Sequence, residues 1–454
     1  MENTKMKSKN ILGYEEVSKL LRKFAIPSIV AMLVSSFYNI IDQIFIGQGV
    51  GYLGNAATNV AFPLTTICLA IALLIGIGSA SNFSIELGKG NVKNAELCVG
   101  NSIWMMGILS IIYFIIIQLF LTPMLNSFGA TETILPYAQD YVKITAFGMP
   151  LLIFTNALSA LIRADGSPKY SMTCMIVGAI INTILDPIFI FILKLGVSGA
   201  ALATVISQFV SFLIAASYIT KFKHIKLGKA SFRPQIREFM KIASLGMSNS
   251  LNQVAITIVQ IVINNSLTYY GAKSIYGQEI PLSSFGIVMK INSIFISVFV
   301  GLSQGSQPII GFNYGARSYS RVKEVYKLAI KSSLIISLIG FIMFQFFPKQ
   351  IISIFGSGNE LYFEFAVKCL RIFLFMVIIN GVQLISSNFF SAIGMPLKGV
   401  ILSLSRQCFF LIPLVIVFPL FCGINGILYA GPVADFIAFL ASIALIKREF
   451  NTMK

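Results

Sequence analysis

The sequence predicts an all-α integral membrane protein with twelve transmembrane helices, arranged as two six-helix lobes related by a pseudo-twofold axis along the membrane normal. Three observations predict it: the apolar composition, long stretches without charge, and an internal repeat. Of the 454 residues, 56% are hydrophobic and only 11% are charged, and the mean hydropathy is +0.84. Soluble domains carry about 25% charged residues, so the composition already favours a chain embedded in lipid.

The charged residues are also segregated along the chain. A spanning helix needs about 20 apolar residues, and five longer stretches contain no Asp, Glu, Lys or Arg: 43–85, 97–131, 242–272, 291–316 and 407–434. One soluble domain of this size cannot enclose five such segments. Hydropathy places the twelve spans near 24–47, 57–83, 98–122, 141–162, 170–193, 197–219, 242–268, 282–308, 330–348, 367–390, 399–419 and 424–446.

The basic residues predict the topology. The net charge is +17, and most Lys and Arg lie in the segments expected on one side of the membrane, which the positive-inside rule assigns to the cytoplasm. This distribution argues against nucleic-acid binding. It predicts a multi-pass protein of the cell membrane with both termini cytoplasmic. The first apolar run is expected to be a retained helix rather than a signal peptide, because the basic N-terminus shows no cleavage-site pattern before it. The predicted divisions are a cytoplasmic N-terminal segment, a first lobe, a basic linker, a second lobe and a cytoplasmic tail, at 1–23, 24–220, 221–241, 242–446 and 447–454.

The two halves share three short patterns at nearly one offset. Two glycines on the second span recur on the eighth, an A-x-G-x-P pattern follows the fourth and the tenth, and a Gly/Ala pattern opens the sixth and the twelfth. The pairs are Gly78 and Gly305, Gly88 and Gly315, 164–168 and 392–396, and Gly196, Gly199 and Ala203 with Gly423, Gly426 and Ala430. Such agreement predicts duplication of a six-helix unit. An even number of helices keeps both copies in the same orientation, with a cavity between them.

Two acids inside the predicted first lobe are candidates for ion coupling, because a charge within lipid is costly. Asp42 and Asp186 lie about 28 Å and about 26 Å along their helices from Lys23 and Lys169, at similar depth. Two further oxygen-bearing side chains reach that level, Asn182 and Thr204. These oxygens suit a hard cation such as Na⁺; alternatively, burial would favour a protonated carboxyl and make one acid a proton carrier. For Asn182 and Thr204, simple hydrogen bonding between helices is the plain alternative.

Other polar residues are candidates for a hinge or a substrate cavity. Pro187 follows Asp186 directly; within a helix it frees a backbone carbonyl and favours a kink. Tyr38 and Asn39 share roughly the face of Asp42. Lys290 and its neighbour Met289 are predicted to line the cavity, although Lys290 could instead extend toward the membrane surface. Asp435, the only acid well inside a span of the second half, could bind a cationic substrate or hold helices together; both remain open. These candidates are Tyr38, Asn39, Met289, Lys290 and Asp435.

Several classes of function find no support in the sequence. The six Cys show no paired spacing and are expected to be packing residues. The single histidine, His224, is expected to be a solvated loop residue. No HExxH pattern and no intramembrane His occurs, so neither an enzyme nor a cofactor is expected, nor a metal beyond a possible Na⁺ at the coupling site. One chain already contains both lobes, so a monomer surrounded by membrane lipids is expected.

The chain resembles the MATE (multidrug and toxic compound extrusion) family, in its prokaryotic DinF- and MepA-like branch. The motifs that carry the resemblance are YNIIDQIFIG at 38–47, NTILDP at 182–187, GAALAT at 199–204 and QGSQPIIGFNYGA at 304–316. The resemblance implies secondary active efflux of small organic, often cationic, compounds by antiport with H⁺ or Na⁺ through alternating access. It also implies that Asp42, Asn182, Asp186 and Thr204 form the cation or proton site.

The resemblance has limits that leave alternatives open. The NorM-like branch uses acids on its seventh and tenth helices, and this chain has none in those spans. MepA-like relatives can carry Asn at the position of Asp42. The alternative function is a flippase for lipid-linked saccharides from the wider superfamily, whose cavity would be expected to hold more cationic residues than Lys290.

Overall fold

The computed structural model describes residues 10–355 and 359–453, and every regular element within them is a helix. The first six spans are α3 (Val17–Gly49), α4 (Tyr52–Lys89), α5 (Val92–Ser127), α6 (Leu135–Ala164), α7 (Pro168–Pro187) with the π-helix η1 (Ile188–Ile192), and α8 (Gly196–Ser217). The other six are α9 (Ile236–Ala272), α10 (Glu279–Gly315), α11 (Tyr319–Phe346), α13 (Glu360–Phe373) with α14 (Val377–Ala392), α15 (Pro396–Leu404) with η4 (Ser405–Leu411) and α16 (Ile412–Cys422), and α17 (Ile424–Thr452). Each predicted span corresponds to one of these helices or helix groups.

Length and hydropathy single out most of these helices as membrane spans. Within the described ranges, ten helices are long and apolar enough to cross a membrane, and α13 with α14 forms an eleventh span that is bent by 49°. The helix α9 is 37 residues long but lies outside this set. Its hydropathy is lowered by Asn, Gln, Ser and Thr residues, which recur along its whole length. The predicted all-α membrane fold is confirmed, with α9 as its most polar spanning helix.

The A-x-G-x-P pattern turns the chain sharply between two spans in each half. Gly166 and Gly394 adopt positive φ angles of 85° and 82°, which glycine reaches without strain. Each glycine therefore ends a helix, and the backbone N–H after it closes back onto the helix, from Ser167 to Ile162 and from Met395 to Phe390. The prolines that follow are the first residues of α7 and α15, where their missing N–H costs nothing.

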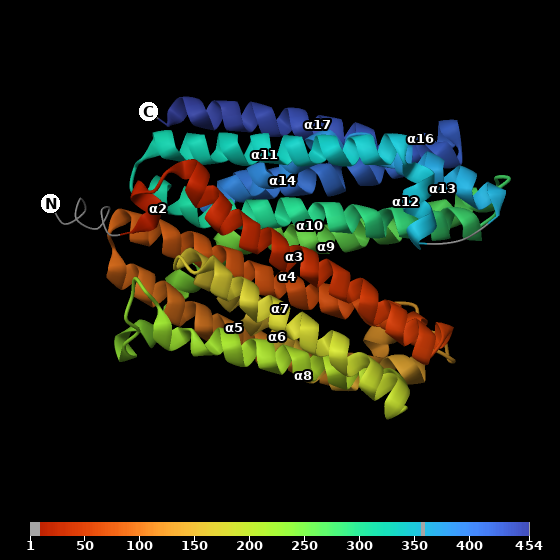
Figure 1. Cartoon of the computed structure of the whole chain (residues 1–454), viewed down its shortest axis with the longest axis horizontal. Coiled ribbons are helices and arrows are strands. Elements are labelled where there is room, and N and C mark those ends of the chain that lie inside the picture. The colour runs from red at the N-terminus through yellow and green to blue at the C-terminus, as the bar shows by residue number, and fades with distance from the viewer. Residues whose placement is uncertain (1–9, 356–358, 454) are drawn as a thin grey trace.

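The two lobes lie side by side as separate groups of helices, with α4 to α8 in the lower half of Figure 1 and α10 to α17 in the upper half, while α3 runs diagonally from the upper left across the middle to the lower right. They meet through α3 and α4 on one side and α9 and α10 on the other, and the repeated glycines lie in these contacts. A Cβ on Gly78 would lie 2.0 Å from the Ile242 carbonyl oxygen, and one on Gly305 would lie 2.6 Å from the Ala25 Cα. Only glycine permits such close backbone approach, so the repeated pattern marks the surface where the lobes touch.

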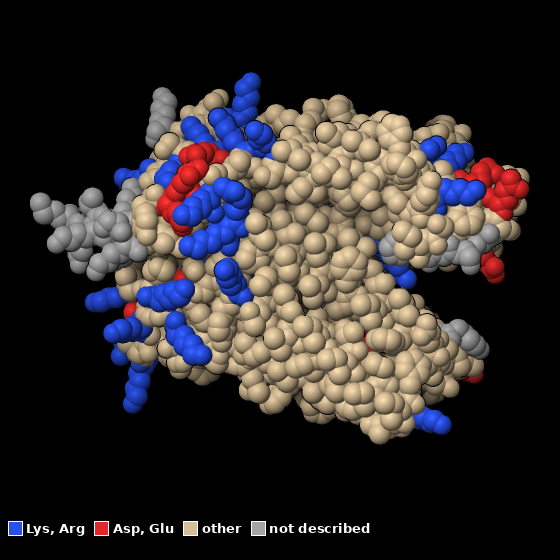
Figure 2. All heavy atoms as spheres, viewed as in Figure 1, with Lys and Arg blue, Asp and Glu red and all other residues tan. Residues whose placement is uncertain are grey.

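A cleft separates the lobes at one end of the molecule. Figure 2 shows a broad uncharged band around the middle, Lys and Arg gathered at the end that carries α2 (Ile11–Tyr14), and a hollow between the lobes at the opposite end. One apolar core is continuous across both lobes and includes Phe83, Leu302 and Ile309, whereas a second lies entirely within the second lobe and includes Val259 and Phe285. The lobes are therefore packed together at the basic end and apart at the other.

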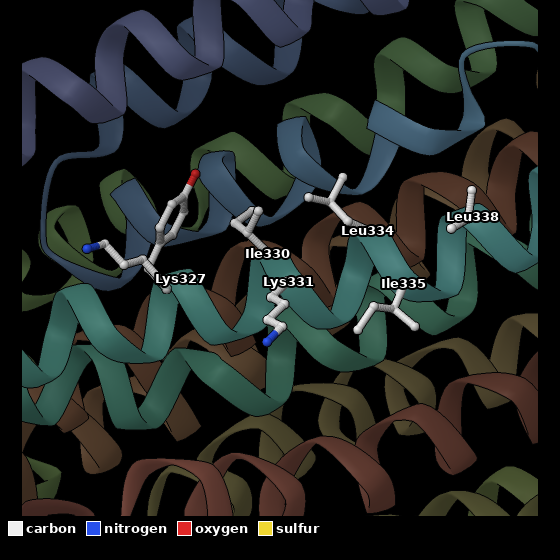
Figure 3. A pocket seen from close by; sticks show the side chains of 7 residues that line it. Lys327, Ile330, Lys331, Leu334, Ile335 and Leu338 are labelled. Atoms are coloured by element: carbon white, nitrogen blue, oxygen red, sulfur yellow. The ribbon is translucent and has the colours of Figure 1, made fainter.

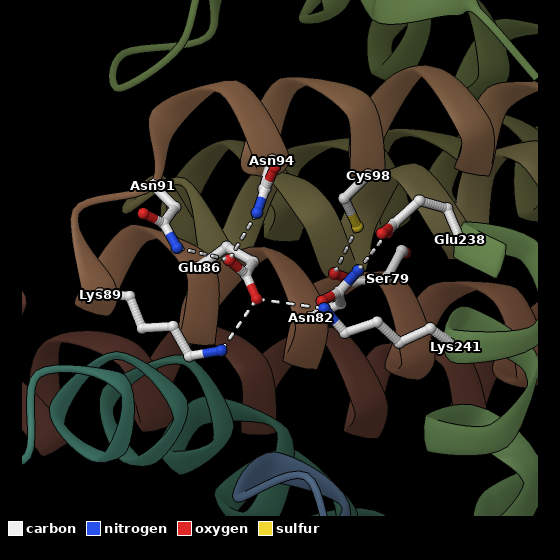
Figure 4. Close-up of polar contacts among 9 residues, drawn as sticks. All are labelled: Ser79, Asn82, Glu86, Lys89, Asn91, Asn94, Cys98, Glu238 and Lys241. Carbon is white, nitrogen blue, oxygen red and sulfur yellow. Dashed lines mark hydrogen bonds and ion pairs between the residues drawn. The ribbon is translucent and has the colours of Figure 1, made fainter. Parts of the chain in front are cut away.

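A polar network crosses the lobe contact at the basic end (Figure 4). Glu86 of α4 is only 3% exposed, and its Oε1 lies 3.0 Å from Lys89 Nζ and 3.1 Å from Lys241 Nζ of α9. The amides of Asn91 and Asn94 donate to its other oxygen, at 3.2 and 3.3 Å. This network satisfies a buried carboxylate and joins α4 to α9 across the two lobes.

A buried carboxylate of the first lobe, Asp165, binds the start of the segment predicted as the basic linker. Asp165, in the first A-x-G-x-P turn, accepts hydrogen bonds from the backbone N–H groups of Lys223 (2.7 Å) and His224 (3.2 Å). The His224 ring contacts the same carboxylate at 3.0 Å, and its side chain is 24% exposed. The prediction that His224 is simply solvated was wrong. Asp165 is buried and needs donors, and the sequence did not reveal that this loop folds back over it.

Candidate functional site

The structure brings the two predicted acids of the first lobe together. Asp42 lies on α3 and Asp186 at the end of α7; they are 7% and 0% exposed, and their carboxyl groups contact each other. On α3, Asp42 lies on a different face from Ala25 and Ile29, the residues that meet α10. The acid pair therefore faces the interior of the first lobe rather than the second lobe.

Asn182 and Thr204 complete the cluster. Asn182 lies one turn before Asp186 on α7, and its Nδ2 donates to Asp186 Oδ1 (3.3 Å) and to Thr204 Oγ1 of α8 (3.4 Å). With the amide turned over, its nitrogen lies 2.9 Å from Asp186 Oδ2 and its oxygen accepts from the Thr204 backbone N–H at 3.3 Å. In either orientation Asn182 connects Asp186 to α8, so all four predicted residues belong to one cluster.

One atom of the cluster is unsatisfied. Asp42 Oδ1 is buried and has no hydrogen-bond partner among the described residues. Two adjacent carboxyl groups in a water-poor site repel each other unless a proton or a cation lies between them, and oxygen ligands of this kind suit Na⁺. The donor set fits either ion: two carboxyl groups, an amide and a hydroxyl.

Two tyrosines border the cluster. Tyr38 lies one turn before Asp42 on α3, with its hydroxyl within hydrogen-bonding reach of Thr204. Tyr141, near the start of α6, lies close to Tyr38, Asp42 and Asp186. Sequence reasoning missed Tyr141, because it falls at the edge of a predicted span, 141–162, where a tyrosine is expected to mark the membrane interface.

Pro187 changes the helix that carries Asp186. The α-helix α7 ends at Pro187 and continues as the π-helix η1, in which the Leu193 N–H bonds to the Ile188 carbonyl at 2.9 Å. A proline cannot donate to the preceding turn, and single π-helical turns of this kind frequently occur at functional sites. The irregularity lies where the sequence predicts a hinge; the motion itself remains a prediction.

The candidates on α10 and one on α3 lie apart from the acid cluster. Lys290 is exposed, and Met289 is half-buried and packs against the core of the second lobe. Asn39 is exposed, and its side chain donates to the Ser35 carbonyl one turn earlier (2.7 Å). None of these three residues touches the acid cluster. Among the predicted substrate-cavity residues on α3 and α10, only Tyr38 contacts the predicted coupling site.

Asp435 has a partner that sequence reasoning did not consider. Its Oδ1 lies 2.5 Å from Arg406 Nε of the π-helix η4, and Asp435 is 3% exposed. The carboxylate is therefore neutralised within the second lobe, so it is not a free anion for a cationic substrate. The sequence feature that could have revealed this pair is Arg406, which lies in the middle of the predicted span 399–419. A charge inside a span needs a counter-charge on a neighbouring helix.

The geometry defines a class of protein. Two six-helix lobes, packed together at one end and parted at the other, are the architecture of a membrane transporter. The family model MatE matches residues 27–188 and again 250–417, one match in each half. The chain therefore belongs to the MatE family of transporters, and the double match confirms the internal duplication.

Relatives of known name span the whole chain. A FAD transporter of Shewanella oneidensis is 26% identical over 459 residues and covers 99% of this chain and 98% of its own. The multidrug export protein MepA of Staphylococcus haemolyticus is 27% identical over 444 residues, covering 96% and 95%. MepA of Staphylococcus aureus is 25% identical over 448 residues, covering 97% and 96%. The resemblance to the MepA-like branch is confirmed at the level of the whole chain.

Solved structures share the fold along its full length. A MATE transporter crystallised with MaL6 superposes with a TM-score of 0.91 at 23% identity, covering 98% of each chain. An outward-facing multidrug resistance MATE transporter superposes with a TM-score of 0.88 at 23% identity, covering 96% of this chain and 97% of its own. These similarities support the predicted architecture of two lobes.

Proposed function

We propose that the chain is a secondary active efflux transporter, which exports small organic molecules by antiport with H⁺ or Na⁺. The observation that carries the proposal is the buried cluster of Asp42, Asp186, Asn182 and Thr204, in which one carboxylate oxygen is left without a partner. Relatives named for multidrug export and for FAD transport support the direction and the class of cargo.

The mechanism follows from the lobe contacts. The lobes close through glycines at the basic end, and the cleft opens at the other end. With the basic end in the cytoplasm of a cell-membrane protein, this arrangement is open to the outside. Binding of the ion next to Asp42 and Asp186, both on the α3–α7 side, would change how these helices pack. The lobes would then rock about the glycine contacts and expose the cleft alternately to the two sides.

Transport by purified protein in liposomes tests the proposal. Export of a fluorescent organic dye is followed under an imposed proton gradient, and then under a sodium gradient. Asp186→Asn and Asp42→Asn are expected to abolish gradient-driven movement, because each removes a charge that the ion must neutralise. The matched control is Asp140→Asn, which changes an exposed acid of α6 that makes no ion pair among the described residues.

The outcomes separate the alternatives. Dye movement under one gradient, lost in Asp186→Asn and retained in Asp140→Asn, identifies the coupling ion. Wild-type rates in both Asp42→Asn and Asp186→Asn would contradict the proposed ion site. Movement of a fluorescent lipid-linked saccharide in place of the dye would favour a flippase.

A further inference from the structure

The wall that the second lobe presents to the cleft differs chemically from the acid cluster of the first. On α9, Gly246 packs directly against α4, since a Cβ there would lie 1.8 Å from the Leu74 carbonyl oxygen. Gln253 and Gln260 follow at intervals of seven residues, which is close to two helical turns, so they share this face nearer the open end. Both are half-buried. Neutral amides thus lie on the face of α9 that carries the Gly246 contact, and one N–H of Gln260 already donates to Asn264 Oδ1 (3.1 Å).

The helix α10 adds a cation to the same wall. Ser297 bonds to Ser36 of α3 at 2.5 Å, which fixes the face of α10 that meets the first lobe. Lys290 lies seven residues earlier on that face, toward the open end, and is exposed. Gly286, one turn further, has no atom within 4 Å of where a Cβ would stand. The helices α10 and α3 therefore touch at Ser297 and are no longer in contact at the level of Lys290.

Lys290 lacks a counter-charge in the protein. It makes no ion pair among the described residues. Of the acids inside the spans, Asp435 is paired with Arg406, and Asp42 and Asp186 contact each other on a different face of α3. Lys290 also lies 11 residues, about 16 Å, from the start of α10, too far for its stem to carry the ammonium to the helix end. A charge at such depth is tolerated where it faces a water-filled cavity, so the Lys290 ammonium is free to bind an anion that enters the cleft.

We propose that Lys290, with the amides of Gln253 and Gln260, binds a carboxylate or phosphate group of the exported compound. The inference rests on the proposed efflux function and names its substrate class: organic anions with hydrogen-bonding groups, rather than organic cations. A charge-assisted bond from Lys290 holds the anionic group, and the amides, which both donate and accept, hold the neutral polar atoms beside it. The first lobe then binds the coupling cation, and the second lobe binds the anionic group of the substrate.

Paired probes test this without requiring the natural substrate. Flavin adenine dinucleotide and riboflavin share one fluorescent ring system, but only the first carries phosphates. Fluorescein and its methyl ester differ by one carboxylate, and ethidium serves as the organic cation. Binding to the full-length purified protein is measured by fluorescence for the wild type, Lys290→Gln and Lys290→Arg.

The control is a lysine on the outer surface. Lys331 of α11 is exposed beside a shallow apolar furrow of about 390 Å³, lined by Leu334, Ile335 and Leu338 (Figure 3), so Lys331→Gln removes one positive charge without touching the cleft.

We expect wild type and Lys331→Gln to bind each anion more tightly than the partner that lacks its phosphates or its carboxylate. Lys290→Gln should weaken binding of the anions about tenfold or more, the effect of one charge-assisted hydrogen bond. It should leave riboflavin unchanged, which also shows that the variant is folded, and it should weaken fluorescein more than the methyl ester, which keeps only the ring phenolate. Lys290→Arg should retain most of the affinity for anions.

Three results would overturn the proposal. The first is equal loss of charged and uncharged probes in Lys290→Gln, and the second is no loss at all. The third is a wild type that binds and exports ethidium but neither anion, which would leave the efflux function standing and remove only the anion preference. A wild type that moves no probe under either ion gradient would count against the efflux function as well.

Discussion

Substituting the interface glycine Gly246 by alanine should shift the balance between the two arrangements of the lobes. The added Cβ would stand 1.8 Å from the Leu74 carbonyl oxygen and 2.6 Å from its carbon. Carbon and oxygen atoms normally approach no closer than about 3.3 Å, so α4 and α9 would have to separate by about 1.5 Å. The clashing atoms belong to the backbone, so no rotation of a side chain can relieve the contact.

The size of the shift follows from the clash alone. Overpacking of a closely packed contact typically costs about 1–3 kcal/mol, and it applies only while the lobes are closed at the basic end. The preference of alanine over glycine within a helix is present in both arrangements, because residue 246 lies inside α9 in each, and so it cancels. Gly246→Ala should therefore favour the opposite arrangement by about 1–3 kcal/mol, a change in population of about fivefold or more.

Spin labels at the basic end would measure this shift. Lys93 at the start of α5 and Glu324 on α11 are exposed positions on different lobes, and cysteines there, in a background without the native thiols, report the separation of the lobes. Gly246→Ala should move the distance distribution toward longer values and slow transport. Gly286→Ala is the matched control, because open space surrounds that position. Wild-type distances in Gly246→Ala would refute the idea that backbone contact at this glycine closes the lobes.

Two further substitutions probe charges that the structure pairs. Arg406→Leu leaves Asp435 buried without its partner, so the free energy of unfolding, measured by thermal unfolding in detergent, should fall by about 3–5 kcal/mol. The double variant with Asp435→Leu should largely restore it. Equal stability of the single and double variants would contradict the ion pair. Glu86→Gln removes the charge that Lys241 contacts across the lobes, and because Lys241 is 40% exposed the effect should be about 1 kcal/mol. The spin-label distances should lengthen as in Gly246→Ala, but less; shorter distances would show that the network does not hold the lobes closed.

Hydropathy could predict the spans but not where the helices end. The second span was predicted at 57–83, whereas α4 runs from Tyr52 to Lys89. An established helix extends into polar turns, because each added residue gains a backbone hydrogen bond at little further cost. The tenth span was predicted as one continuous helix, whereas α13 and α14 are bent by 49° at 374–376. No proline or glycine occurs there, so the sequence carries none of the usual signals of a kink.

The contact between the two acids could be predicted from the sequence, because it depends only on how deep each acid lies in the membrane. Asp42 and Asp186 lie at equal heights on helices that run in the same direction, and the structure places them in contact. Pairings that depend on which helices are neighbours could not be predicted in this way. Arg406 and Asp435 are 29 residues apart and meet only because η4 packs against α17. Tyr141 joins the acid cluster for a similar reason, since helix packing rather than sequence spacing directs its ring.

The repeated glycines also bear on how such a transporter could arise. Gly78 and Gly88 of one half contact α9 and α10, and Gly305 and Gly315 of the other contact α3 and α4. Each half thus uses the same surface to bind the other, which is the isologous contact of a symmetric homodimer. A six-helix ancestor with this surface would already have made a two-lobed pore by self-association. Fusion of the two copies then freed each to diverge, so that acids in one lobe and a lone lysine in the other became possible within a single gene product.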